Sequence, residues 1–290
     1  MHAEEKYKIT IVTATFNSAK TLEQTITSIV AQDYPNIEYI IVDGSSVDGT
    51  LDIIKKYEGM IDLRWISEPD AGIYDAFNKG IDMATGDYIH FLGSDDSMCN
   101  AHTISSVVKQ LENDTDILSA PIKVIDEKSG REYLGCNQYY MDKANYHGGM
   151  IPHPGMFVKT SLMEKYKFDT SYKIAADYKF FLQCYYDDSI HFKYISEPVV
   201  FFAKSGSSSV LSKCWEENNR LYSELGLPFH APSLDGPFLF ECLVRKILWR
   251  LGVLAPALQL ADFVIRGVKS RFIWQKHTCD NPVCRWCGRM

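Results

Sequence analysis

The chain has 290 residues, of which 46% are hydrophobic and 23% charged, so it can bury a full core and lacks the composition of a disordered protein. Its formal net charge of -7 gives the whole chain no electrostatic reason to bind nucleic acid. Eight cysteines are too dilute for a disulfide scaffold, and no apolar signal segment opens the chain. We therefore expect one large cytoplasmic domain with appendages.

Strand-like and helix-like segments alternate along the first half of the chain. A β-branched, apolar run at 9–15 is followed by a turn at Asn17 and by apolar residues at helical spacing until Gln32. The elements expected after these are strands at 39–43, 63–67, 88–92 and 116–125, and helices at 51–57, 73–83, 103–111, 176–186 and 209–225. This alternation predicts right-handed βαβ crossovers and a mainly parallel sheet covered on both faces, which is an α/β fold.

Polar segments follow the first four expected strands. They lie at 13–17, 43–45, 68–70 and 95–96. Because ligands of open α/β sheets bind beyond the carboxyl ends of the strands, these segments are expected to converge on one acidic site. Carboxylates suit Mg²⁺ or Mn²⁺, which commonly bridge them to substrate phosphates. An isolated pair such as Asp95 and Asp96 also fits a simple turn before a helix.

Three stretches of the chain resemble the family 2 glycosyltransferases of GT-A fold, of the bacterial cell-surface polysaccharide type. They are TATFNS at 13–18, VDGSSVDGT at 42–50 and SEPDAGIYDAFNKGIDMATGDYIHFLGSDD at 67–96. With later motifs the resemblance spans about residues 8–224. It implies a Rossmann-like catalytic domain at 1–235, with a nucleotide-sugar half at about 8–115 and an acceptor half at about 116–235.

The resemblance also implies which side chains meet the nucleotide-sugar donor. They are Thr13, Asn17, Asp43, Asp75, Asn78, Asp95 and Lys204. Thr13 and Asn17 would line the nucleotide site, and Asp43 would accept a hydrogen bond from the nucleobase or ribose. Asp75 and Asn78 are three apart on the expected helix and would face the donor together, although helix capping is the alternative for Asp75. Lys204 belongs to a segment, 203–209, that would close over the diphosphate or serve as an ordinary linker.

A divalent cation is implied by Asp95 and Asp96, which match the end of the family's Asp-X-Asp-type motif. Gly93 stands where the first aspartate of the fuller motif often lies. Which of the two carboxylates ligates Mn²⁺ or Mg²⁺ directly is therefore left open. The diphosphate and water can complete the shell of such an ion.

Asp177 is the expected catalytic base, because the stretch IAADYKFFL at 174–182 resembles the family segment that supplies it. An inverting transfer needs a group that accepts the proton of the acceptor hydroxyl. The start of a helix is expected to favour ionisation of Asp177, and a role as helix N-cap alone is the alternative. His153 is a weaker candidate for facing the acceptor, since a lone histidine is more often structural.

The end of the chain differs from the acidic body. From residue 237 onward, nine basic residues stand against three acidic ones, and 236–276 is interpreted as a basic amphipathic helical extension. Residues 237–276 suit an anionic membrane surface, which would place the protein at the inner face of the cell membrane. The alternative is that the extension packs against the catalytic domain or a partner subunit.

The last segment, 277–290, contains three cysteines with C-x4-C-x2-C spacing. With a preceding histidine they fit four zinc ligands, namely His277, Cys279, Cys284 and Cys287. A disordered tail with reactive thiols is the alternative.

These features predict an inverting glycosyltransferase that moves a single sugar from a nucleoside diphosphate, with UDP expected, onto a glycan or lipid-linked saccharide hydroxyl. A sugar-nucleotide pyrophosphorylase would need a glycine-rich, basic loop after the first strand, which residues 13–18 lack. A non-catalytic scaffold or binding subunit of a glycan-assembly complex stays open as the second interpretation.

Overall fold

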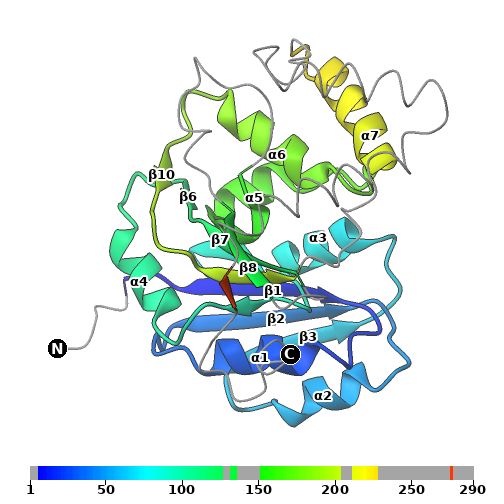
Figure 1. The fold of residues 1–290 in the computed structure, drawn as a ribbon, viewed down its shortest axis with the longest axis vertical. Helices are drawn as coiled ribbons and strands as arrows, with labels where there is room; N and C mark the ends of the chain where they lie inside the picture. The colour runs from blue at the N-terminus through cyan, green and yellow to red at the C-terminus, as the bar shows by residue number, and fades with distance from the viewer. Residues whose placement is uncertain (1–5, 127–130, 136–150, 204–210, 228–274, 277–290) are drawn as a thin grey trace.

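The computed structural model describes residues 6–126, 131–135, 151–203, 211–227 and 275–276. Its main sheet has seven strands in the order β10-β6-β9-β4-β1-β2-β3 (Figure 1). These strands are β1 (Ile9–Thr15), β2 (Ile37–Asp43), β3 (Asp62–Ser67), β4 (Tyr88–Phe91), β6 (Ile117–Ser119), β9 (Met156–Lys159) and β10 (Phe192–Tyr194). β9 runs antiparallel to both of its neighbours, whereas the other pairs are parallel, which confirms the mainly parallel sheet.

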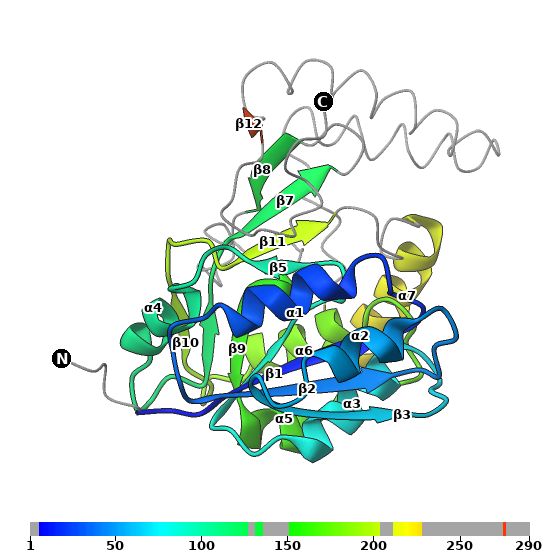
Figure 2. The same cartoon turned by 90° about the horizontal axis from the view of Figure 1, so that it is seen from below.

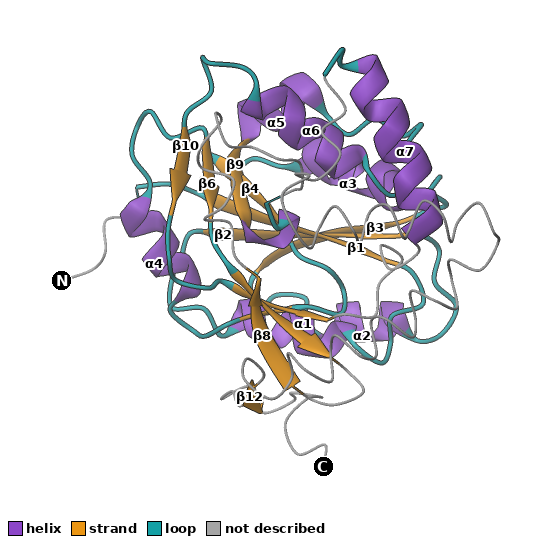
Figure 3. Ribbon diagram, turned by 45° about the horizontal axis from the view of Figure 1, so that its top comes forward, coloured by secondary structure: helices purple, strands orange, loops and turns teal. Residues whose placement is uncertain are grey.

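Helices cover both faces of this sheet (Figure 3). They are α1 (Leu22–Val30), α2 (Thr50–Lys56), α3 (Ile73–Met83), α4 (Thr103–Gln110), α5 (Thr160–Tyr166), α6 (Ala176–Tyr185) and α7 (Leu211–Glu224). Ile9 and Ile11 of β1 pack in one core cluster with α1, α2 and α4, while Val12 packs in the other with α3, α5 and α6. β1 and β2 are rich in apolar residues because both of their faces are buried.

A second sheet lies beside α1 (Figure 2). Its strands, in the order β12-β8-β7-β11-β5, are β12 (Gln275–Lys276), β8 (Arg131–Gly135), β7 (Ile122–Asp126), β11 (Val200–Ala203) and β5 (Ser97–Met98). The expected single strand at 116–125 is wrong, because the chain leaves the first sheet at Ala120 and enters the second after Pro121. Proline cannot donate a ladder hydrogen bond. The Ala120 carbonyl also lies where a side chain at Gly155 would stand, 2.1 Å from an ideal Cβ.

β12 corrects the expectation of a helical extension through residue 276. Gln275 and Lys276 form a strand that pairs antiparallel with Glu132 and Arg131 of β8. The rest of the predicted extension lies outside the described residues.

The amino ends of the first strands hold a buried charged network. Glu38 is only 1% exposed and accepts hydrogen bonds from Thr10 Oγ1 at 2.7 Å and from the Thr85 amide at 2.8 Å. Lys8 and Arg64 pair with the same carboxylate. Burial alone would raise the pKa of Glu38, but these hydrogen bonds and the Arg64 charge lower it to about 2. The network ties β2 to the segment before β4, at the strand ends opposite the loops described next.

Candidate functional site

The loops after β1, β2 and β4 touch one another, as the sequence predicts. Asn17 has a left-handed backbone, with φ of 50°, and its amide donates to Ser46 Oγ at 2.7 Å. Its side-chain oxygen accepts a hydrogen bond from the Val47 amide at 3.0 Å. The hydroxyls of Ser18 and Ser94 are 3.0 Å apart. Asparagine tolerates this backbone conformation. Through its two hydrogen bonds Asn17 joins the loops after β1 and β2 at the edge where a ligand is expected.

Thr13 and Asp43 are placed differently from the predicted donor contacts. Thr13 is fully buried within β1, and its hydroxyl accepts a hydrogen bond from Tyr39. Asp43 is also fully buried, and its carboxylate accepts hydrogen bonds from the Ser46 amide, the Ser46 hydroxyl and the Ser67 hydroxyl, at 2.9, 2.5 and 2.6 Å. In this conformation both residues organise the strand ends and present no surface to a nucleotide.

Asp75 and Asn78 on α3 also have structural partners. Asp75 Oδ2 accepts a hydrogen bond from the Ala71 amide at 3.0 Å, just before Gly72, which is the N-cap of α3. Asn78 binds the backbone of Phe168 through both amide atoms, donating to its carbonyl at 2.8 Å and accepting from its amide at 2.9 Å. The contact of Asn78 with the donor stays a prediction, and in this structure both of its amide atoms bind Phe168 instead. Its amide joins α3 to the chain after α5 because both polar atoms are used there.

Asp95 and Asp96 follow β4 and differ in burial. Asp95 is half-buried, whereas Asp96 is 2% exposed and its Oδ1 accepts a hydrogen bond from the Ala203 amide at 2.8 Å. A Cβ on Gly93 would lie 2.6 Å from Asp96 Oδ2 and 3.0 Å from Asp95 Oδ1. The space of the family's first aspartate is thus taken by these two carboxylates. Within the described part of the chain, no group of three His, Cys, Asp or Glu residues is arranged to hold a metal.

Asp177 is the second residue of α6 and is half-buried. Its Oδ1 accepts hydrogen bonds from Tyr74 Oη at 2.9 Å and from the Tyr178 amide at 2.8 Å. The N-cap residue is Ala175, so the capping alternative is wrong. Burial raises the pKa of Asp177 to about 6, against the lowering effect of these hydrogen bonds. The helix start was expected to favour the ionised form, but the cost of burying the charge has the larger effect on the pKa of Asp177.

His153 stands in an aromatic cluster. Its ring stacks on Phe91, with centroids 5.3 Å apart, and also contacts Phe77 and Phe168. Burial among these rings lowers the pKa of His153 to about 4. A neutral ring packed in this way fits the structural interpretation better than contact with an acceptor.

The remaining predicted residues cannot be placed. Lys204, most of 237–276 and the zinc candidates His277, Cys279, Cys284 and Cys287 lie outside the described residues. Of the helices that the structure describes, none has the length and apolar character required to cross a membrane.

Three exposed apolar side chains near the site were missed from the sequence. Phe16, Val47 and Ile73, which follow β1, follow β2 and begin α3, are 63%, 90% and 49% exposed. All three residues belong to the motif segments, but the sequence does not show that their side chains are exposed, because exposure depends on tertiary packing. Phe16 Cδ2 lies 3.4 Å from the position of a Cβ on Gly44. An exposed aromatic ring at this edge suits stacking against a planar base.

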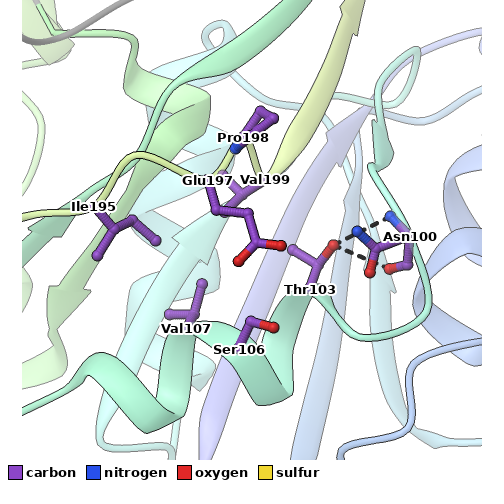
Figure 4. A pocket seen from close by; sticks show the side chains of 8 residues that line it. All are labelled: Asn100, Thr103, Ser106, Val107, Ile195, Glu197, Pro198 and Val199. Carbon is purple, nitrogen blue, oxygen red and sulfur yellow. Dashed lines mark hydrogen bonds between the residues drawn. The ribbon is translucent and has the colours of Figure 1, made fainter.

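A crevice lies between the start of α4 and the segment before β11 (Figure 4). Asn100, Thr103 and Ser106 line it on one side, and Ile195, Glu197 and Pro198 on the other. Thr103 Oγ1 donates to the Asn100 carbonyl at 3.0 Å and accepts from the Asn100 amide at 3.2 Å. These atoms stabilise the start of α4. None of the predicted site residues lines the crevice.

Comparison with known proteins identifies the family. Residues 10–170 match the sequence family described as Glycosyl transferase family 2. The chain belongs to this family. A PGL/p-HBAD biosynthesis glycosyltransferase of Mycobacterium bovis is 27% identical to this family 2 glycosyltransferase over 224 residues, which cover 75% of this chain and 86% of that protein. An uncharacterized glycosyltransferase of Methanocaldococcus jannaschii is 28% identical over 237 residues, covering 78% and 80%.

Solved structures agree in fold. S. aureus TarS 1-349 in complex with UDP-GlcNAc superposes with a TM-score of 0.59 and 22% identity, covering 69% of this chain and 59% of that one. The mannosyltransferase PcManGT from Pyrobaculum calidifontis, in complex with GDP-Man and Mn²⁺, superposes with a TM-score of 0.61 and 18% identity, covering 90% and 76%. The family 2 glycosyltransferase described here therefore has the predicted GT-A fold.

Proposed function

We propose that this glycosyltransferase moves one sugar from a UDP-sugar onto a hydroxyl of a glycan or lipid-linked saccharide, with inversion at the anomeric carbon. The observation that carries the proposal is Asp177, a half-buried carboxylate in the first turn of α6 whose pKa is raised to about 6. A base of this pKa is largely ionised at neutral pH and accepts a proton more readily than an ordinary aspartate.

In the proposed step Asp177 takes the proton of the acceptor hydroxyl. The acceptor oxygen then forms a bond to the anomeric carbon, and the bond from that carbon to the diphosphate oxygen breaks on the opposite face. Phe16 is the proposed stacking partner of the nucleobase, and Asn17 holds the loop that carries it. The electron pair leaves with the nucleoside diphosphate, whose charge must be stabilised.

Asp95 and Asp96 fit a divalent cation in ligand chemistry, because Mn²⁺ and Mg²⁺ prefer oxygen ligands and often bind one or two carboxylates together with substrate phosphates. We propose Asp95 and Asp96 as the residues that hold it. When bound, the ion would neutralise charge on the diphosphate. The structures of related fold that hold UDP-GlcNAc, or GDP-Man with Mn²⁺, support this proposal by analogy.

The test of the function compares Asp177→Asn with Asp187→Asn, a control two residues beyond the end of α6 whose carboxylate binds Ser189. Nucleotide release is measured from a panel of UDP-sugars with saccharide acceptors, and UDP affinity by titration calorimetry with Mn²⁺. Asp177→Asn is expected to keep the UDP affinity and lose turnover by about 10²–10⁴-fold, while the control keeps both. A wild type that binds UDP and never turns over any donor would favour the scaffold interpretation.

We further propose that the basic segment at 237–276 brings the enzyme to the inner, anionic face of a membrane, where a lipid-linked acceptor would be presented. The proposal rests on the alternation of apolar and basic residues, including Arg245, Lys246 and Arg250. The last two residues of the segment, Gln275 and Lys276, pair with β8. This pairing supports the alternative, in which the segment only packs on the domain.

A further inference from the structure

The hydroxyl of Tyr74 lies between two acceptors on α6 and the segment before it. Tyr74 is the second residue of α3 and is 7% exposed, with its ring 5.4 Å from that of Phe168. Its Oη is 2.6 Å from the Ile174 carbonyl oxygen and 2.9 Å from Asp177 Oδ1. A phenol has one hydrogen to donate. Tyr74 therefore cannot donate to both oxygens at once.

The two contacts match the two protonation states of Asp177. When Asp177 is ionised, Tyr74 donates to the carboxylate in a charge-assisted hydrogen bond. When Asp177 is protonated, its own O–H can donate to Tyr74 Oη, and the Tyr74 hydrogen turns to the Ile174 carbonyl. In the ionised state the Tyr74 hydrogen goes to the carboxylate and not to the Ile174 carbonyl, whereas in the protonated state the added proton is bound by Tyr74 Oη and the Tyr74 hydrogen by the Ile174 carbonyl, so a proton can arrive on Asp177 without leaving a buried group unsatisfied.

Glu217 of α7 holds the same segment from the other side. Its Oε2 accepts hydrogen bonds from the Ile174 and Ala175 amides at 2.8 and 2.9 Å, and its Oε1 accepts from the Lys173 amide at 2.7 Å. These three amides precede α6, and three charge-assisted bonds to one carboxylate fix the backbone there. The side chain that closes the start of α6 thus comes from a helix about forty residues further along the chain.

We propose that Tyr74 and Glu217 are positioning residues for Asp177, which set its orientation and, in opposite directions, its readiness to hold a proton. The proposal rests on the proposed function, in which Asp177 is the base. Tyr74 faces Asp177 from α3, and the negative charge of Glu217 acts on it from α7. The nearby cations are turned elsewhere, since Lys173 donates to the Ala71 carbonyl and Lys179 pairs with Asp169 and Glu224.

The direction of each effect follows from the charge. The hydrogen bond from Tyr74 lowers the pKa of Asp177, and the Glu217 carboxylate raises it, both acting on a value that burial has raised. Tyr74→Phe removes the hydroxyl and keeps the ring, so the pKa of Asp177 should rise. Glu217→Gln removes the charge and keeps an acceptor oxygen for the Ile174 and Ala175 amides, at the loss of the bond from the Lys173 amide, so the pKa of Asp177 should fall. A general loosening of the fold would not produce opposite shifts.

The experiment measures the ionisation of Asp177 directly in the full-length protein. Side-chain carboxyl resonances of ¹³C-aspartate-labelled protein are followed by NMR across the acid range, and Asp177→Asn assigns the resonance. We expect an upward shift of at least about half a pH unit in Tyr74→Phe and a downward shift of similar size in Glu217→Gln. Tyr172→Phe is the matched control, because its hydroxyl binds Glu224 at 2.8 Å instead of Asp177.

Shifts of the same sign, or no shift in either variant, would overturn the proposal. If Glu217→Gln does not fold, an unmoved resonance in Tyr74→Phe overturns it alone. The measurement needs no substrate, so its failure is distinct from failure of the proposed function, which unchanged turnover in Asp177→Asn would reveal. Where turnover is measurable, the acid limb of kcat/KM should move with the resonance in each variant, while UDP affinity stays at the wild-type value.

Discussion

The hydroxyl of Tyr74 lies 2.9 Å from Asp177 Oδ1, although 103 positions separate the two residues in the sequence. The contact joins the first turn of α3, which follows the β3 loop, to the first turn of α6. Lys173 makes a second link between the same regions by donating to the Ala71 carbonyl at 2.9 Å. The proposed base is thereby fixed relative to the half of the fold that would bind the nucleotide.

Burial of Asp177 should make the wild-type enzyme less stable above its pKa than an uncharged variant. Because the pKa is raised from 3.8 to about 6, the folded protein loses stability as the pH rises through this interval and the charge must be buried. Asp177→Asn should therefore raise the Tm at about pH 7.5 and change it little below pH 4 or so. Differential scanning calorimetry at both pH values measures this; a lower Tm for the variant at the higher pH contradicts it.

The same ionisation predicts the pH dependence of turnover. Asp177 acts as a base only when deprotonated, so kcat/KM should decline as the pH falls through about 6. The decline should follow a single ionisation of the free enzyme. A profile that remains flat to pH 5 or so would argue against Asp177 as the base.

Asp95→Asn should weaken the binding of UDP in the presence of Mn²⁺ and leave metal-free binding unchanged. The reason is that an amide is a poorer ligand than a carboxylate for a hard cation. Titration calorimetry with and without Mn²⁺ gives the comparison, with Asp52→Asn, on α2, as the surface control. Equal metal dependence in Asp95→Asn and wild type would remove Asp95 from the proposed metal site.

Asn78→Ala should destabilise the fold without changing UDP affinity. Both hydrogen bonds to the Phe168 backbone are lost, and Phe168 is 3% exposed. The expected loss is about 1–3 kcal/mol in the free energy of unfolding. The control is Asp82→Ala, on the same helix as Asn78, which breaks an exposed ion pair with Lys167 after α5. Urea titration should give a loss of less than about 1 kcal/mol for this control. Weakened UDP binding in Asn78→Ala would restore the donor role that the sequence suggested.

Glu38→Gln should lower stability at neutral pH and converge with wild type in acid. The pKa of Glu38 is lowered from 4.5 to about 2, so its contribution is present above the unfolded value and disappears as the pH falls through this interval. We expect a loss of about 1–3 kcal/mol at neutral pH by urea unfolding. Asp62→Asn, which removes a half-exposed partner of Lys8, is the control with a smaller effect.

Replacing Arg245, Lys246 and Arg250 by glutamine in the full-length chain tests the membrane proposal. Each basic residue near an anionic surface contributes about 1 kcal/mol, so binding to phosphatidylserine vesicles should fall by at least tenfold. Sedimentation with anionic and with neutral vesicles separates charge from apolar binding. Unchanged binding to the anionic vesicles would favour packing of this segment on the domain.

The fold was largely predictable because its first half is built from local patterns. Mainly apolar runs that are buried on both faces predict β1, β2 and β4, and the helix expected at 73–83 matches α3. The passage from β6 to β7 was missed because an apolar run does not reveal which sheet receives it. Pro121 was the available signal.

The site was less predictable at the level of individual residues. Asp43 and Asn78 sit in motif positions, yet their partners, Ser67 and Phe168, come from other parts of the chain. A polar side chain that a motif assigns to a ligand can instead have all of its hydrogen bonds within the protein. The roles of Tyr74 and Glu217 depend likewise on contacts across the fold, which no local spacing indicates.

Asp96 lies on the short link between β4 of the first sheet and β5 of the second, and it also accepts the amide of Ala203 at the end of β11. One carboxylate therefore ties three strands together while being a candidate for the cation. Substitution of Asp96 would disturb the joint between the sheets along with any metal, and lost activity in such a variant would not distinguish the two causes. Asp95, which is less buried, is the position at which the chemistry can be varied separately from the architecture.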